Sequence, residues 1–176
     1  AGELSKIVTI NVKGDATIER DEGFAITLSN PVGGILDAAS TASGTILSDD
    51  ATISLTTTSV TNDEGTGGTT PFQFTVTRTG GINVPASVKY VVAANGSGVN
   101  ASNAADFGAA FPSGIINFAP GESARTLTIN VNADSAVESD EGFKVTLSAP
   151  TGATLGTATA TGTIRTDDSL LSIAAT

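Results

Sequence analysis

Hydrophobic and polar residues alternate with a period of two along several short stretches of the chain. The alternation is clearest in residues 72–78, 87–92, 126–131 and 142–147. Side chains of a strand point alternately to its two faces, so this pattern predicts strands with one buried and one solvated face. Three further strands are expected around apolar positions of the same kind: Ile53 and Leu55, Ile116 and Phe118, and Ile164.

Seven short strands within one stretch of about 118 residues predict an all-β fold, in which two antiparallel sheets pack face to face as a sandwich. The apolar residues are mostly Val, Ile, Leu and Ala, and Thr, Ser and Gly fill much of the remainder, a mixture that favours strands and turns over helices. Residues 94–112 are rich in Asn, Ser, Gly and Ala, and we expect them to form a long loop.

The chain contains an internal repeat. Residues 2–33 and 121–152 are identical at 17 of 32 positions with an offset of 119, and residues 43–50 match 161–168 with an offset of 118. The period is therefore about 118 residues, long enough for one complete sandwich.

This period divides the chain into three parts. Residues 1–50 are the C-terminal part of one repeat, residues 51–168 are a complete repeat, and residues 169–176 begin a further one. The first part supplies only about three strands, which cannot bury a core alone. Either the chain is a piece of a longer array, or identical chains complete one another by strand donation and assemble head to tail into a filament.

Charge and composition exclude several classes of function. A net charge of −10 without any basic patch excludes nucleic acid as a partner. The absence of His and Cys excludes disulfides, the usual zinc sites and Ser-His-Asp catalysis. No stretch reaches the roughly 18 apolar residues of a membrane span, so we expect no membrane insertion.

Acidic residues gather in the loops and at the repeat junction. In an antiparallel sandwich the loops after the first, third and fifth strands and the junction after the seventh lie at one end, and all four are acidic. Crowded carboxylates repel one another unless a cation lies among them, and an all-oxygen donor set suits Ca²⁺. The alternative is that these acids are solvated loop residues that confer solubility. The acids concerned in the complete repeat are Asp63, Glu64, Asp106, Asp134, Glu138, Asp140, Glu141, Asp167 and Asp168.

The repeated segment resembles a known family. The stretch DSAVESDEGFKVTLSAPTGATLGTATATGTIRTDD, and its earlier copy DATIERDEGFAITLSNPVGG with SGTILSDD, are similar to the second half of a Calx-beta repeat. The first half, with SVTNDEGTGGTTPFQFTVTRTGG, Ala-Asp-Phe at 105–107 and INFAPGES at 116–123, fits more loosely. The resemblance implies a seven-stranded immunoglobulin-like sandwich that binds calcium where its acidic loops meet.

Carried over by position, the resemblance implies a set of metal ligands in the complete repeat: Glu64, Asp106, Asp134, Glu138, Glu141, Asp167 and Asp168, with Asp140 as an additional one. The corresponding acids of the first copy are expected to act in the same way: Asp15, Glu19, Glu22, Asp49 and Asp50.

The function expected from these features is that of a non-catalytic module of tandem repeats at the cell surface or outside the cell. Calcium would stiffen it for a structural or adhesive role, with neighbouring repeats or identical chains as partners. The alternative is a calcium-sensing regulatory domain of a larger protein. An enzyme or sugar-binding domain is disfavoured, because the acids lie at a tip and no aromatic platform lines a cleft.

Overall fold

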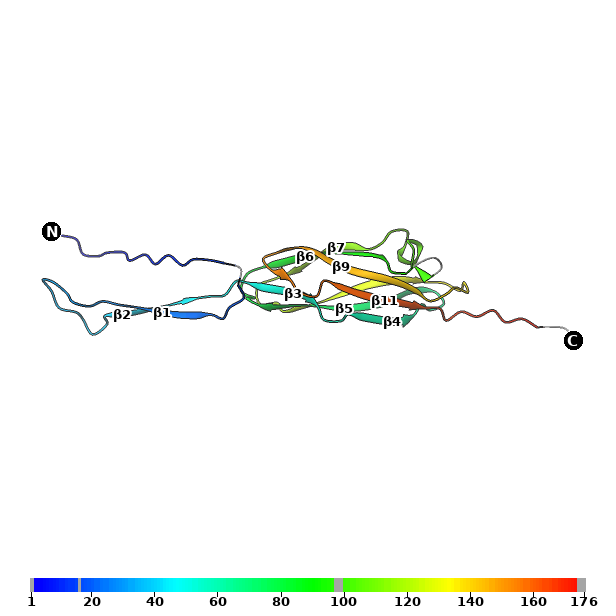
Figure 1. The fold of residues 1–176 in the computed structure, drawn as a ribbon, viewed down its shortest axis with the longest axis horizontal. Helices are drawn as coiled ribbons and strands as arrows, with labels where there is room; N and C mark the ends of the chain where they lie inside the picture. The colour runs from blue at the N-terminus through cyan, green and yellow to red at the C-terminus, as the bar shows by residue number, and fades with distance from the viewer. Residues whose placement is uncertain (1, 16, 97–99, 174–176) are drawn as a thin grey trace.

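The computed structural model describes residues 2–15, 17–96 and 100–173 (Figure 1). Residues 51–168 form a sandwich of two β-sheets. Residues 2–50 extend beyond one end of this sandwich, and residues 169–173 extend beyond the opposite end (Figure 1). Of the last predicted segment, residues 174–176 lie outside the described part of the chain. No helix among the described residues is long and apolar enough to cross a membrane.

Two sheets of four and five strands make up the sandwich. The first has the order β10-β3-β5-β8 and comprises β3 (Ala51–Leu55), β5 (Gly68–Gly80), β8 (Ala124–Ala133) and β10 (Thr154–Leu155). The second has the order β4-β11-β9-β6-β7 and comprises β4 (Ser59–Asp63), β6 (Ala86–Ala94), β7 (Ser113–Phe118), β9 (Glu141–Thr151) and β11 (Thr159–Arg165).

The core is built from the apolar face that the alternation predicts on each strand. Phe72 and Phe74 of β5 point across the interior to Phe143 of β9, and the Phe72 and Phe143 rings meet edge to face with their centroids 5.3 Å apart. This geometry suits the quadrupoles of the two rings. The remaining large apolar residues that are buried come from every predicted strand: Ile53, Leu55, Val76, Val88, Val92, Ile116, Phe118, Leu127, Ile129, Val131, Val145, Leu147 and Ile164.

The structure adds two short strands to the seven predicted ones. β4 covers residues 59–63 and β10 covers residues 154–155, and each pairs in parallel rather than antiparallel, β4 with β11 and β10 with β3. Both were missed because β10 has only two residues and β4 has no buried residue in its pattern. The sandwich is therefore antiparallel except at these two edges.

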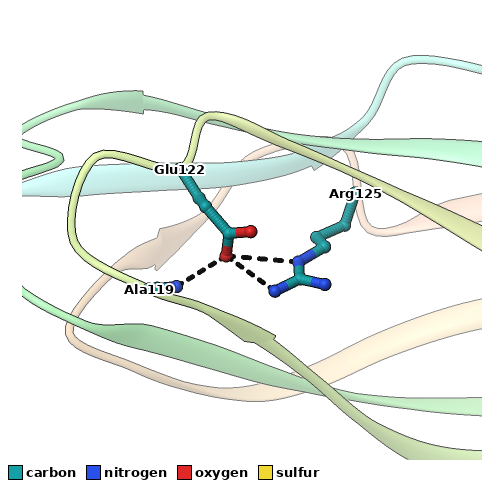
Figure 2. A network of polar contacts seen from close by, with 3 residues as sticks. All are labelled: Ala119, Glu122 and Arg125. Carbon is teal, nitrogen blue, oxygen red and sulfur yellow. Dashed lines mark hydrogen bonds and ion pairs between the residues drawn. The ribbon is translucent and has the colours of Figure 1, made fainter.

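The long loop predicted at 94–112 carries a turn of 3-10 helix, η2 (Ala105–Phe107). The shorter turn between β7 and β8 is held by Glu122. Its Oε2 atom accepts hydrogen bonds from the Ala119 backbone N–H at 2.7 Å and from Nε and Nη2 of Arg125 at 3.2 and 2.8 Å (Figure 2). These bonds lower the pKa of Glu122, the backbone bond from Ala119 having the largest effect.

Residues 2–50 form only part of a sandwich. β1 (Glu22–Thr27) and β2 (Thr41–Ile46) pair as an antiparallel hairpin, and the segment before them runs alongside without entering a sheet (Figure 1). Its apolar residues Val8, Ile10 and Val12 are exposed.

The connection between the two parts is held closely against the complete repeat. The backbone N–H of Gly81 donates to the Asp50 carbonyl at 2.6 Å, and Nη2 of the buried Arg78 donates to the Gly81 carbonyl at 2.7 Å. A β-carbon on Gly81 would come within 2.5 Å of the Ser48 carbonyl oxygen. The β5–β6 turn and the end of the first part therefore fit together only because residue 81 has no side chain.

Candidate metal centre

Acidic side chains from four separate segments meet at the end of the sandwich that lies opposite residues 2–50. Glu64 directly follows β4, Asp106 lies in η2, and Asp168 follows β11. Asp134 and Glu138 lie in the loop from β8 to β9, and Glu141 is the first residue of β9. All six take part in the interactions that raise the pKa values of the three glutamates, so the carboxylates at this end of the sandwich influence one another electrostatically.

Glu64 is the most enclosed member of this group, with 6% of its surface exposed. Its backbone N–H donates to the Arg165 carbonyl at 2.9 Å, and its carbonyl accepts a hydrogen bond from the Thr70 hydroxyl. Burial, together with nearby negative charges of which Asp134 has the largest effect, raises the pKa of Glu64 to about 7. Desolvation and like charges act in the same direction on a carboxyl group.

The pKa of Glu141 is raised by the same kinds of interaction as that of Glu64. Burial, a hydrogen bond with Asp106 and the charges of Asp106 and Glu138 raise its pKa to about 8. The pKa of Glu138 is also raised, first by burial and then by Asp134 and Asp106. Near neutral pH Glu64 and Glu141 therefore retain protons for part of the time. The reason is that burial and the neighbouring carboxylates both disfavour a further negative charge at this end of the sandwich.

Local hydrogen bonds orient two of these carboxylates. Both oxygens of Asp106 are engaged by Asn103, one by its backbone N–H at 2.6 Å and the other by its side-chain amide at 3.1 Å. One oxygen of Asp134 accepts from the Ala136 backbone N–H at 2.7 Å. Each bond fixes the position of a carboxylate on a segment that has no regular strand.

Two further predicted ligands, Asp140 and Asp167, accept hydrogen bonds from the backbone of a neighbouring segment. Asp140 accepts from the Thr166 backbone N–H at 3.1 Å, and Asp167 accepts from the Gly65 backbone N–H at 3.1 Å. Neither carboxylate is among the charges that raise the pKa of Glu64 or of Glu141. They tie the end of β11 to the loops that carry the other acids. Asp63 lies apart from the group and pairs with Arg165 at 2.8 Å.

The chemistry of the group fits a hard cation, although its geometry does not yet enclose one. All donors are oxygens, and one carboxylate oxygen of Asp168, Oδ2, is buried without a hydrogen-bond partner. In the part of the chain that the structure describes, no three acidic side chains stand close enough together to hold a metal ion.

The acids of the first copy gather at the other end of the sandwich, where the two parts of the chain join. Together with the cations Lys13 and Arg20, they line one hollow: Asp15, Glu19, Glu22, Asp49 and Asp50. A backbone hydrogen bond from Thr17 lowers the pKa of Asp15. This group has no counterpart of Glu64 or Asp106, because residues 2–50 contain only the second part of a repeat.

Sequence patterns did not indicate how two polar residues of the loop between β6 and β7 are placed. Asn100 donates from its side chain to the Asp140 carbonyl at 3.0 Å, and Ser102 is buried with its hydroxyl unpartnered. Both residues lie in the loop predicted at 94–112. A run of Asn, Ser and Ala has no periodicity from which such contacts can be inferred, and the only available signal is the repeated Asn within an otherwise small-residue loop.

Comparison with known proteins gives one family. A model of the Calx-beta domain matches residues 1–51 and 47–168. A search of the curated proteins found no match.

Several solved structures are similar to the complete repeat. The apo-form Calx CBD1 domain has a TM-score of 0.58 and 30% identity, and the match covers 67% of this chain and 98% of that one. CBD12 from CALX1.2 has a TM-score of 0.57 and 30% identity, and this chain covers 66% of its own length but only 46% of that longer chain.

The Calx CBD2 domain has a TM-score of 0.55 at 17% identity over 66% of this chain and 86% of that one, a likeness of fold alone. The structures agree with the immunoglobulin-like sandwich that the sequence predicts, and the family model extends over both copies of the repeated segment. The chain belongs to the Calx-beta domain family.

Proposed function

We propose that the complete repeat, residues 51–168, is a calcium-binding regulatory module. The observation that carries the proposal is the uncompensated negative charge at the tip of the sandwich, where Glu64 and Glu141 have their pKa raised to about 7 and about 8. One of the similar structures is described as the calcium binding domain CBD12 of CALX1.1, and another as the apo form of Calx CBD1.

Six residues of this tip would hold the ion: Glu64, Asp106, Asp134, Glu138, Glu141 and Asp168. Ca²⁺ accepts six to eight oxygens in flexible arrangements, so a group contributed by loops suits it better than it suits Mg²⁺, which requires a stricter octahedron. Asp140 and Asp167 keep their backbone bonds and hold the loops in place. Binding would replace the protons of Glu64 and Glu141 and remove the repulsion among the six carboxylates.

The acidic residues at this tip come from segments that are far apart in the sequence, and this supports a regulatory role. These segments number four, and Asp168 lies immediately before the segment that leaves the sandwich. A cation that draws these segments together would also fix the direction in which residue 169 leaves the domain. Calcium binding would in this way be communicated to whatever is attached there.

Calorimetric titration of the full chain with Ca²⁺ at pH 7.5 tests the proposal, with Mg²⁺ as the control ion. A regulatory site is expected to bind Ca²⁺ with a dissociation constant of about 10⁻⁷–10⁻⁵ M and to bind Mg²⁺ much more weakly. Absence of a calcium signal up to millimolar concentration would contradict the function proposed here.

A second function is favoured by a separate observation, the close fit between the Gly80-Gly81 turn and the end of the first part at Ser48–Asp50. A rigid joint of this kind suits an extracellular spacer or adhesion module whose repeats are stiffened by calcium. Such modules bind calcium with dissociation constants of about 10⁻⁴–10⁻³ M. The same titration therefore separates the two functions by affinity.

A further inference from the structure

The two sheets of the sandwich end in strands of very different length. Each sheet has a short parallel strand at one edge, β10 or β4, and an antiparallel strand at the other edge, β8 or β7. β8 is the longest of the four, with ten residues against two, five and six in β10, β4 and β7. A long edge strand has a row of free backbone groups with which a further strand can pair.

The direction of these free groups follows from one hydrogen bond at the start of β8. The Arg78 backbone N–H donates to the Ser123 carbonyl at 2.8 Å, in the register that places Thr77 opposite Ala124. Hydrogen-bonded and non-bonded pairs alternate along an antiparallel ladder, so the odd-numbered residues of β8 bond to β5. The N–H and C=O groups of four exposed, even-numbered residues therefore point away from β5: Ala124, Thr126, Thr128 and Asn130.

The β8 edge lacks the features that commonly prevent edge strands from pairing with other chains. β8 contains neither proline nor glycine, and its pairing with β5 runs through ten successive residue pairs without a bulge. Its one charged residue, Arg125, forms an ion pair with Glu122 at 2.8 Å (Figure 2). The charge on this strand is thus compensated within the chain.

The distribution of charge favours contact between two copies on this side of the sandwich. The chain has a net charge of −10, and large groups of its acids lie at the tip of the sandwich and at the joint with the first part. β7 and β8 contain no acidic residue. Two identical chains can therefore approach through β8 with little electrostatic repulsion.

The free part of this edge has a defined length. At its far end the Asn132 side-chain amide donates to the Ala105 carbonyl at 2.7 Å, so the η2 turn lies against the last residues of β8. The free edge comprises the preceding residues, 124–130. Leu127 is the central residue of this stretch, and a strand that pairs with all of it is centred there.

Residues 124–130 are complementary to a second copy of themselves. In an antiparallel pair centred on Leu127, Thr126 of each copy lies opposite Thr128 of the other, and Ala124 lies opposite Asn130. All four residues direct their backbone groups outward, as hydrogen-bonded pairs require. Threonines then face each other on the solvent side and leucines on the core side, and cross-strand pairs of these kinds stabilise a sheet.

An apolar hollow lies beside the same edge. It has a volume of about 400 Å³ and is lined by residues of β6, β7 and β8 that include Tyr90, Ile115 and Leu127. Ile115 is 57% exposed. A second copy placed on β8 stands next to this hollow, so association removes apolar surface from water in addition to completing backbone hydrogen bonds.

We propose that the open edge of β8 is a dimerisation surface, at which two copies of this chain pair antiparallel about Leu127. Their four-stranded sheets join into one continuous sheet. The copies are related by a two-fold axis and each sandwich stays complete, which distinguishes this dimer from strand donation between chains arranged head to tail. The surface does not include the acidic tip, so the dimer is independent of the calcium-binding function proposed above.

Sedimentation equilibrium of the full chain with a chelator tests the association. The average mass is expected to rise from that of one chain toward that of two as the protein concentration is raised to about 1 mM, which covers weak association. Thr128→Pro is expected to abolish this rise. Its N–H points outward, so proline at this position leaves the bonds between β8 and β5 intact.

Two further variants support this test. Thr128→Val is the matched control, because it keeps the backbone donor and a β-branched side chain, and it is expected to associate like the unmodified chain. The double variant Thr126→Lys and Thr128→Lys places like charges opposite each other in the pair and is expected to remain a single chain. This variant keeps the test decisive if proline prevents folding.

Cysteine cross-linking tests the register. The chain has no cysteine of its own. Chains with Thr126→Cys and chains with Thr128→Cys are expected to form a disulfide when mixed, because the two positions lie opposite each other with their Cα atoms about 5.5 Å apart. Each variant alone is the matched control, since identical positions are offset by two residues, about 7 Å, along the strands.

Three results would overturn the proposal. The first is a mass that stays at that of one chain up to about 1 mM. The second is undiminished association of Thr128→Pro and of the double lysine variant, which would place the contact elsewhere. The third is a cross-link from Thr128→Cys to Thr9→Cys in preference to Thr126→Cys, which would make the exposed residues 6–12 of a second copy the occupant of the edge.

Discussion

The ring of Phe143 lies directly over Gly162, on the neighbouring strand of the same sheet. The two residues are opposite one another in the pairing of β9 with β11, and a β-carbon on Gly162 would overlap the ring. Phe24 and Gly44 have the same relationship in the hairpin of residues 2–50. Both glycines are therefore required for close approach of a ring and not for a turn.

The surroundings of the two rings differ, and this gives the first prediction. Phe143 is fully buried between Phe72 and Phe74, so Gly162→Ala is expected to cost about 1–3 kcal/mol of the unfolding free energy. Phe24 is only partly buried and its ring has room to turn aside, so Gly44→Ala is expected to leave the main transition unchanged. Chemical denaturation of the two variants measures this, and equal losses would contradict the assignment of Phe143 to the core.

The raised pKa of Glu64 predicts how stability depends on pH without metal. Its pKa is about 7 in the folded chain and 4.5 ordinarily, so between these values the folded chain holds a proton that the unfolded chain has released. Stability without metal is therefore greatest below about pH 4.5 as far as this group is concerned, and is lost as the pH rises through 7. The pKa of Glu141 is about 8, so the stability of the metal-free chain is expected to continue to fall up to about pH 8.

Glu64→Gln is expected to remove much of this dependence and to raise the melting temperature at pH 8 in the presence of a chelator. The exposed Glu3→Gln is the matched control and is expected to have little effect. Melting curves at pH 5, 6, 7 and 8 provide the measurement. A melting temperature that rises with pH across this range in the unmodified chain would contradict the uncompensated charge at the tip.

Most of the fold could be predicted from the sequence because burial alternates along its strands. Phe72, Phe74 and Val76 are buried and separated by polar residues, and this alternation alone identifies β5. β4 has no buried residue, so its place at the edge of a sheet depends on parallel pairing with β11, which no local pattern reveals.

The candidate metal site could be predicted less completely than the fold. Strand order brings the acidic loops to one end of the sandwich. Which of their carboxylates bond to the backbone and which interact with one another depends on local hydrogen bonds. Asp140 and Glu141 are adjacent in the sequence and both carry a carboxylate, so residue type does not distinguish their roles. Asp140 binds the Thr166 backbone, whereas Glu141 enters the carboxylate group. The environment of each oxygen decides this, and it is set by loops without periodicity.

Asp168 provides a prediction on the site itself. Its Oδ2 atom is buried without a partner, and its charge raises the pKa of Glu64. Asp168→Asn is expected to weaken calcium binding at least about tenfold, because one charged ligand is lost. Asp63→Asn is the control, since Asp63 pairs with Arg165 outside the group. Calorimetric titration compares the two, and a similar loss in both would indicate an effect of net charge alone.

The joint at Gly81 gives the last prediction. Any side chain at this position meets the backbone of Ser48 and Asp49, which cannot move aside as a flexible side chain would. Gly81→Ala is therefore expected to break the hydrogen bond from residue 81 to the Asp50 carbonyl and to free residues 2–50 from their fixed direction. The core of residues 51–168 does not include this contact, so its melting temperature is expected to change little.

Small-angle scattering measures this loss of direction as a broader distribution of interatomic distances at the longest lengths. Gly67→Ala is the matched control, because a β-carbon on Gly67 meets no other atom within 4 Å. An unchanged distribution in Gly81→Ala would mean that the close fit does not set the direction of the first part. A large fall in melting temperature would mean that the β5–β6 turn belongs to the folding unit of the core, because only a contact within that unit can transmit the strain to its transition.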